Sequence, residues 1–177
     1  PAADFLPDAD HLAPLTRLVE KVTGNPLLDG NALEPLRDGD EAYPAMLQAI
    51  DEAEHSIGLA MYIFDHDSSG LRFVAALERA VARGVQVRVL VDDIGAHFTW
   101  SSIVGPLRAA GVPVARFLPT ILSRYFAYAN LRNHRKILVV DGRIGFTGGI
   151  KISDGNRQVV KPPHPIRDMM FRIEGPV

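Results

Sequence analysis

The feature of this sequence that most constrains its fold is an alternation of apolar runs with helical segments, which begins at residue 55. The run HSIGLAMYIF has the length of a buried strand, and the segment LRFVAALERAVARG after it has helical spacing and a stop signal at Gly84. The alternation continues through a second strand, a second helix and a third strand, at residues 85–93, 101–111 and 112–117. Strand, helix and strand in this order imply right-handed crossovers, so we predict an α/β fold with a mixed, largely parallel β-sheet flanked by helices on both faces.

The segments on either side of this alternation extend the same fold. Later strands are predicted at residues 136–142, 143–149 and 168–174. Earlier helices are predicted at residues 10–22 and 41–53. We therefore expect a lead-in segment with one helix over residues 1–40 and a single domain over residues 41–177.

Composition narrows the classes of function without choosing one. The 177 residues, 47% of them hydrophobic, suit one domain with a buried core. The net charge of −2 argues against a uniformly basic surface, so binding of nucleic acid or anionic lipid would need a local basic patch. Candidates for this patch are Arg116, Arg124, Arg132, Arg135 and Arg143, and the alternative is that these arginines form a solvated face. The absence of cysteine excludes disulfides, thiolate metal sites and a cysteine nucleophile.

The two ends of the sequence are unusual for a whole protein. The chain opens at Pro1 without a methionine and stops at Val177 directly after a predicted strand, so we expect a piece of a longer protein. The residues given contain no apolar run of about eighteen residues and no recognisable export signal.

The most informative segment is NHRKILVVDGRIGFTGG, in which His134, Lys136, Asp141 and the pair Gly148-Gly149 have the spacing His-x-Lys-x4-Asp-x6-Gly-Gly. In an extended strand, side chains two positions apart project to the same face, so His134 and Lys136 are expected to point together. A glycine pair lets backbone N–H groups approach a bound phosphate without obstruction. Ordinary residue frequencies make the His-Lys-Asp spacing a chance event in roughly one chain in a hundred, and the glycine pair lowers that about a hundredfold.

These residue types suit attack on a phosphodiester. The nucleophile must be uncharged near neutral pH, and an imidazole with an ordinary pKa of about 6.5 meets that condition. A lysine can then offset the charge on the non-bridging oxygens. The hypothesis from the residues is therefore a phosphodiester-cleaving site that needs no metal and no other cofactor.

The segment resembles the HKD motif of the phospholipase D superfamily, and most of all the first motif of bacterial cardiolipin synthases. The likeness extends in the same order through segments outside the motif, namely residues 57–64, 70–77, 82–93, 107–114 and 167–177. It covers nearly the whole chain from about residue 25 onward and implies the first catalytic half of such a synthase.

This resemblance implies a role for each matching residue. His134 would attack phosphorus to form a phosphohistidine, and Lys136 would bind phosphate oxygens. Asp141 would be the structural acid of the motif, although an aspartate in an Asp-Gly sequence is also a common turn former. Asp168 resembles the acid that accepts a hydrogen bond from the second ring nitrogen of the nucleophile, and the alternative for it is a plain surface residue.

One position departs from the family pattern. The family usually has asparagine two positions after the glycine pair, and this chain has Lys151. Lysine can also donate to a phosphate oxygen, with a longer reach and an added charge. We expect a retained but altered phosphate site, with a weakened site as the alternative.

Enzymes of this superfamily build one active site from two HKD motifs, and this chain has one. The resemblance implies that a second half supplies the general acid, either as a further part of the chain or as another copy in a homodimer. The leading hypothesis is a phosphatidyltransferase or phospholipase acting on a phospholipid such as phosphatidylglycerol. The alternatives are a homodimeric phosphodiesterase acting on nucleic acid, the less favoured partner, and a non-catalytic half that binds phosphate and scaffolds an active partner. The resemblance implies a membrane surface as a further partner of the full-length protein; a cytoplasmic protein is expected otherwise.

Two other polar clusters have a plainer interpretation. Asp65, His66 and Asp67 could suggest metal ligands, but polar residues between a buried strand and a Ser-Ser-Gly sequence are typical of a loop. Asp92 and Asp93 end a predicted strand, where ligand sites occur in open parallel sheets. A role at the site is one possibility for them, and an ordinary strand end is the other.

Overall fold

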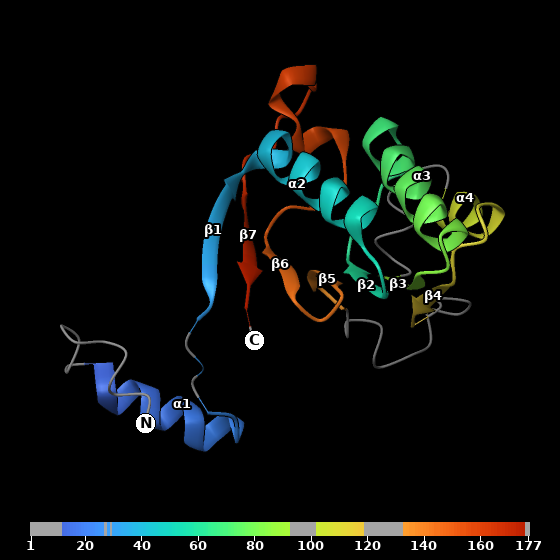
Figure 1. Ribbon diagram of the computed structural model, residues 1–177. Helices are drawn as coiled ribbons and strands as arrows, with labels where there is room; N and C mark the ends of the chain where they lie inside the picture. The colour runs from blue at the N-terminus through green and yellow to red at the C-terminus, as the bar shows by residue number, and fades with distance from the viewer. Residues whose placement is uncertain (1–11, 27, 29, 93–101, 119–132, 176–177) are drawn as a thin grey trace, which may run out of the picture.

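The protein folds around one mixed β-sheet with helices packed on it, as the computed structural model in Figure 1 shows. The structure describes residues 12–26, 28, 30–92, 102–118 and 133–175. The strands are β1 (Ala32–Arg37), β2 (Ser56–Met61), β3 (Gln86–Asp92), β4 (Val114–Phe117), β5 (Lys136–Val140), β6 (Ile144–Gly148) and β7 (Met169–Glu174). The helices are α1 (Ala13–Thr23), α2 (Asp38–Glu52), α3 (Ser68–Ala82), α4 (Val104–Ala109) and the short 3-10 turns η4 (Asp154–Asn156) and η5 (Gln158–Val160).

The sheet has the strand order β1-β7-β6-β5-β2-β3-β4. The α/β class and the mixed sheet are confirmed, but the parallel share is smaller than predicted. Among the strands of the described residues, the pairs β2–β3 and β3–β4 are parallel. Strands β5, β6, β7 and β1 join by antiparallel pairing, which begins where β5 pairs with β2. The strand–helix–strand order indicates only the parallel part of the sheet. Strands β5 and β6 are joined by a tight turn at Asp141 and Gly142, and β6 and β7 by a segment that contains η4 and η5, and both pairs are antiparallel.

Local sequence signals account for the helix next to the site. The side chain of Asp67 accepts a hydrogen bond from the backbone N–H of Gly70 at 2.9 Å and so caps the start of α3. After the helix, Gly84 takes a φ of 87°, which ends the helical path before β3. The helix that connects β2 to β3 therefore begins after an aspartate cap and ends before a glycine with a positive φ.

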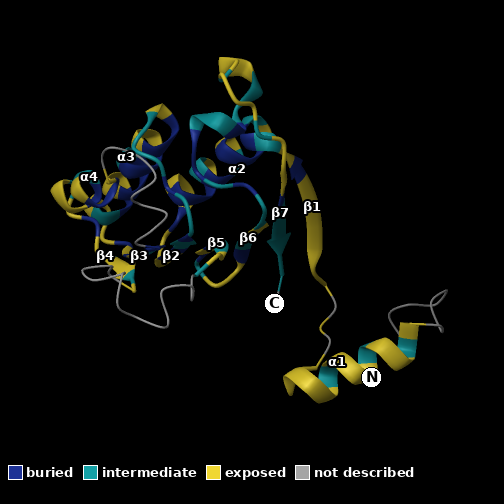
Figure 2. Ribbon diagram, turned by 180° about the vertical axis from the view of Figure 1, so that it is seen from behind, coloured by how far each residue is buried: buried dark blue, intermediate teal, exposed yellow. Residues whose placement is uncertain are grey.

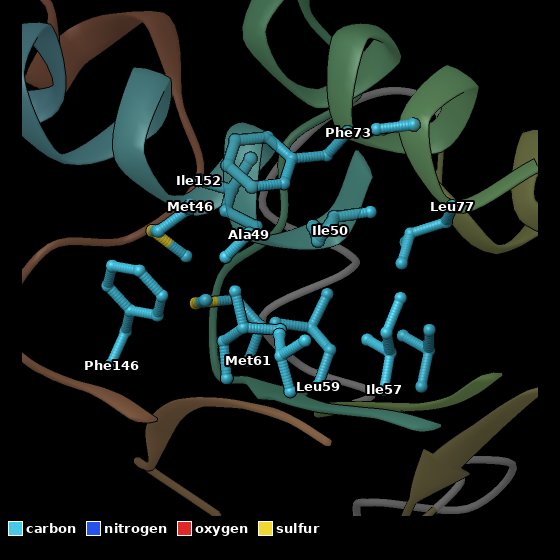
Figure 3. Packing of buried hydrophobic residues seen from close by; sticks show 14 of the residues in the cluster. Met46, Ala49, Ile50, Ile57, Leu59, Met61, Phe73, Leu77, Phe146 and Ile152 are labelled. Carbon is cyan, nitrogen blue, oxygen red and sulfur yellow. The ribbon is translucent and has the colours of Figure 1, made fainter. Parts of the chain in front are cut away.

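The hydrophobic core lies between the helices and one face of the sheet. Figure 3 shows Met46 and Ile50 of α2 and Phe73 of α3 above side chains of the strands. Leu59 of β2 is 2% exposed and Phe146 of β6 is 1% exposed. Burial of each such side chain stabilises the fold by about 1.5–3 kcal/mol.

The opposite face of the sheet is open among the described residues. Figures 1 and 2 place α2, α3 and α4 on the same side of the sheet, where the prediction had helices on both. On the other side Val139 is 41% exposed, and a groove of about 270 Å³ runs past Ile137, Val139 and Ile173. The helices thus cover the face from which Leu138 and Val140 project.

The segment before the main body contains an amphipathic helix and an edge strand. Helix α1 lies apart from the sheet in Figure 1 and has no buried residue. Strand β1 pairs with β7 and so belongs to the sheet. The division of the chain near residue 40 stays a prediction. Among the described residues, no helix has the length and apolar character needed to cross a bilayer.

Candidate active site

The start of β5 brings the predicted nucleophile and cation into contact. Lys136 is the first residue of β5, and His134 lies two positions earlier. The Lys136 Nζ lies 3.1 Å from the His134 Nδ1 and donates to the His134 carbonyl oxygen, also at 3.1 Å. A charged lysine can only donate, so in this arrangement Nδ1 accepts and the ring hydrogen of a neutral imidazole sits on Nε2.

An aromatic residue that the sequence interpretation missed holds the imidazole. The rings of Tyr62 and His134 have centroids 4.2 Å apart and are tilted by 38°. The Lys136 Nζ lies 5.8 Å from the centroid of the same Tyr62 ring. The available signal was an aromatic residue directly after a buried strand, which by itself does not distinguish a site residue from a core residue.

Burial changes the acid–base behaviour of the lysine. Partial burial of Lys136 lowers its pKa, and the negative charge of Asp168 opposes that shift. The net direction is downward. Lys136 therefore loses its charge at a lower pH than an exposed lysine would.

Asp168 lies beside the glycine pair at the junction of β6 and β7. A Cβ added to Gly149 would overlap the Asp168 carboxylate, and one added to Gly148 would overlap the Met169 carbonyl oxygen. The glycines thus allow the start of β7 to approach β6 closely. The Asp168 Oδ1 accepts from the Met169 N–H at 2.8 Å, and among the described residues no hydrogen bond joins Asp168 to His134.

The backbone around Lys151 is held by a buried tyrosine. The Tyr43 hydroxyl lies 2.6 Å from the Lys151 carbonyl oxygen, to which it donates, and accepts from the Ser153 N–H at 2.9 Å. Tyr43 is 1% exposed, and burial raises its pKa well above the ordinary value for tyrosine. It therefore stays protonated and able to donate. No hydrogen bond or ion pair in the described part of the chain joins Lys151 to His134 or Lys136.

Asp141 lies at the other end of β5 from Lys136. Its carboxylate accepts hydrogen bonds from the backbone N–H groups of Glu54, His55 and Ser56 at 2.7–2.9 Å. Burial opposes its ionisation, but these three bonds outweigh burial and lower the pKa of Asp141. The residue ties the β5–β6 turn to the start of β2, away from the other motif residues.

The remaining polar candidates are dispersed. Asp67 caps α3 and accepts from the Asp154 N–H at 2.6 Å. Across the described residues no group of three or more histidine, aspartate or glutamate side chains is arranged to hold a metal ion. Arg135 and Arg143 lie at opposite ends of β5, and Arg143 pairs with Glu174 at 3.6 Å. The predicted positions Asp93, Arg124 and Arg132 lie outside the described residues.

A hollow of about 580 Å³ opens beside the nucleophile. Its described lining consists of Leu90, Phe117, Asn133, His134 and Arg135. His134 therefore borders a space that is lined by apolar side chains and by Arg135.

The fold is similar to that of several solved structures. Nuc, a phospholipase D family member from Salmonella typhimurium, superposes with a TM-score of 0.61 at 20% identity, over 82% of this chain and 85% of that one. The phosphatidylserine synthase of Haemophilus influenzae gives a TM-score of 0.62 at 16% identity, over 81% of this chain and 33% of that one. At these identities the likeness concerns the fold.

Sequence relatives give a closer assignment. Residues 46–158 match the family model described as cardiolipin synthase, PLD-like domain, and the chain belongs to this family. It is 34% identical to cardiolipin synthase 1 of Bacillus anthracis, over 96% of this chain and 33% of that protein. It is 41% identical to the cardiolipin synthase of Alkalihalophilus pseudofirmus, over 81% of this chain and 29% of that protein. The chain thus spans about a third of the length of these relatives.

Proposed function

We propose that this chain is one catalytic half of a phospholipase D-type phosphatidyltransferase or phospholipase. The observation that carries the proposal is the contact between the Lys136 ammonium and the His134 imidazole at the edge of an open hollow. A nucleophile and a cation in contact can engage the phosphorus and the non-bridging oxygens of one phosphodiester. Family membership supports the same class of reaction.

The reaction runs in two displacements. A ring nitrogen of His134 attacks phosphorus, and the bond from phosphorus to the head-group oxygen breaks. An acceptor alcohol or water then attacks phosphorus, and the nitrogen–phosphorus bond breaks, returning its electron pair to the imidazole. A second histidine donates a proton to the departing alcohol and takes one from the acceptor.

Lys136 changes partner during the first displacement. Attack through Nε2 requires an electron pair there, so the ring hydrogen must lie on Nδ1, where Lys136 now donates. When phosphate oxygens draw the ammonium away, Nδ1 is free to carry the hydrogen. Asp168, whose charge acts on Lys136, is the candidate to accept that hydrogen bond and stabilise the imidazolium.

The other predicted residues complete the phosphate site. The backbone at Gly148 and Gly149 and the side chain of Lys151 would contact phosphate oxygens, with Tyr43 holding the Lys151 carbonyl. Asp141 would act structurally through the β5–β6 turn. A second HKD half, in the same longer protein or in another copy, would supply the second histidine. The substrate would be a phospholipid such as phosphatidylglycerol, presented at a membrane surface.

Bis(p-nitrophenyl) phosphate tests the first displacement by itself, because p-nitrophenolate leaves without needing a proton. The expected result is a burst of about one equivalent of p-nitrophenolate per chain. An acid-labile mass increase should appear on the peptide that contains His134. The His134→Ala variant should give neither, and an equal burst from that variant would overturn the proposal. So would a folded wild-type chain that gives no burst at any protein concentration.

Two activated substrates then test the substrate class. Phosphatidyl-p-nitrophenol in micelles should give a faster burst than thymidine 5′-(p-nitrophenyl phosphate), because Leu90 and Phe117 give part of the hollow an apolar lining. The reverse order would favour a nuclease. Phosphate binding without an adduct from either substrate would favour a scaffolding half.

A further inference from the structure

The backbone at His134 needs an anchor outside the strand ladder. Strand β5 begins at Lys136, and Met61 of β2 is the partner of that residue. His134 lies beyond this last pair, so the ladder does not determine where its imidazole points. Catalysis by a nucleophile requires its position to be held closely, because small displacements cost large factors in rate.

A buried carboxylate reaches this part of the backbone from two strands away. Asp92 is the last residue of β3 and is 0% exposed. Its Oδ2 accepts a hydrogen bond from the backbone N–H of Asn133 at 3.0 Å. Asn133 directly precedes His134, so the bond holds the peptide that leads into the nucleophile. A hydrogen bond to a buried charged acceptor is among the stronger kinds.

The register of the sheet explains how Asp92 reaches Asn133. Met61 ends β2 opposite Val91, so β3 continues one residue further, to Asp92. The next residue after β2, Tyr62, donates its N–H to the Arg135 carbonyl oxygen at 3.0 Å. Asp92 therefore lies one position beyond the end of β2, next to the backbone that leads into His134.

Hydrogen bonds thus hold the backbone on both sides of His134. Asn133 is held by Asp92, and Arg135 is held by Tyr62. The Asn133 side-chain oxygen also accepts from the Arg135 N–H at 3.3 Å. With the ring of Tyr62 against the imidazole, the residue is constrained through its backbone and its side chain.

We propose that Asp92 is a positioning residue, which orients the His134 nucleophile through the backbone amide of Asn133. The inference rests on the proposed function for the role of His134, and on geometry for the attachment itself. Asp92 does not touch the phosphorus in this arrangement. Its contribution is to keep the imidazole against the Tyr62 ring, beside the hollow.

The experiment compares Asp92→Ala, which removes the acceptor, with Asp92→Asn, which keeps a carbonyl oxygen at the same place. Asp141→Asn is the matched control, since Asp141 also accepts backbone N–H groups but at the far end of β5. Labelled histidine reports the His134 ring resonances by NMR, including the upfield shift expected from stacking on Tyr62. The bis(p-nitrophenyl) phosphate burst reports rate and amplitude separately.

Asp92→Ala should move the His134 resonances away from their stacked positions and slow the burst about tenfold or more. The burst amplitude should stay near one equivalent, because the chain remains folded and only its alignment is changed. Asp92→Asn should largely restore both readouts, and Asp141→Asn should leave the His134 resonances in place. A folded Asp92→Ala protein with unchanged His134 resonances would overturn the proposal, whether or not the chain proves catalytic.

A second measurement decides the matter if Asp92→Ala fails to fold. In labelled Asp92→Asn, scalar coupling across the hydrogen bond to the Asn133 amide can be observed directly. The coupling between residue 92 and the Asn133 amide, and the His134 resonances typical of stacking on Tyr62, should persist together or be lost together. Coupling with a displaced imidazole, or an undisturbed imidazole without coupling, would each contradict the role of residue 92.

Discussion

The two ends of β5 carry residues of one motif under different physical conditions. At its start, Lys136 and His134 contact each other beside an open hollow. At its end, Asp141 has a φ of 53° in a turn, and its carboxylate accepts three backbone N–H groups from the start of β2. Spacing within a motif therefore does not imply proximity, because a strand of five residues separates the predicted nucleophile and cation from Asp141.

The pKa values of Lys136 and Asp141 are both lowered, but the shift disfavours the charged form of the lysine and favours that of the aspartate. Burial lowers the pKa of Lys136, which weakens its charged form. At Asp141 burial acts against the charge, but the backbone N–H groups prevail and strengthen the charged form. The start of the strand therefore holds a cation whose charged form is disfavoured, and the end holds a stabilised anion.

The largest expected effect is the loss of the nucleophile. His134→Ala should abolish the p-nitrophenolate burst, a decrease of about a thousandfold or more, because no other described group can replace the imidazole. The side chain is exposed, so the free energy of unfolding should change by about 1 kcal/mol or less. Burst kinetics and urea denaturation check the two parts. A large loss of stability would show that this end of β5 is structural as well.

The second effect in size is the loss of the cation. Lys136→Met keeps the apolar stem but removes the charge, and should slow the burst about a hundredfold by removing stabilisation of the phosphate oxygens. Lys136→Arg is the matched control, with an expected smaller loss because the charge remains. Equal rates for the methionine and wild-type proteins would remove Lys136 from the phosphate site.

The third effect concerns stability at the other end of the strand. Asp141→Asn should lower the free energy of unfolding by about 2 kcal/mol at neutral pH, because the charged acceptor of three backbone N–H groups is lost. The folded pKa of Asp141 lies below the ordinary value, so its contribution is full above that value and lost as pH falls through the folded pKa.

Denaturation of the wild-type and Asp141→Asn proteins at neutral and at acid pH measures this contribution. The two stability curves should converge below the ordinary pKa range of aspartate. A parallel offset at every pH would show that the effect is not carried by the charge. The burst rate of the variant should stay within about threefold of wild type.

The smallest expected effect is a shift in pH dependence. Since burial lowers the pKa of Lys136, binding of a phosphate analogue such as tungstate should weaken with rising pH before an ordinary lysine would lose its charge. NMR of the labelled Lys136 ammonium and tungstate titrations should give the same midpoint. A midpoint at or above the ordinary lysine value would mean that Asp168 dominates over burial.

Much of the fold could be predicted from local patterns. The apolar runs at residues 55–64 and 85–93 correspond to β2 and β3, and the helical segment between them corresponds to α3. Strand β1 was missed because its sequence ALEPLR does not alternate apolar with polar residues and contains Pro35, and only Leu36 is buried there. Such an edge strand is recognisable mainly through its partner β7.

The sequence by itself was enough to predict the kind of chemistry, since His134 and Lys136 two positions apart indicate a nucleophile beside a cation. The tertiary structure decided which other residues serve that pair. Through the order and register of β5, β2 and β3, Tyr62 contacts the His134 ring and Asp92 binds the backbone of the neighbouring Asn133. Asp168 lies where β7 approaches Gly149, and its charge acts on Lys136. These contacts join residues far apart in the chain. Periodicity reports only which face a side chain occupies, whereas strand pairing decides what lies next to it.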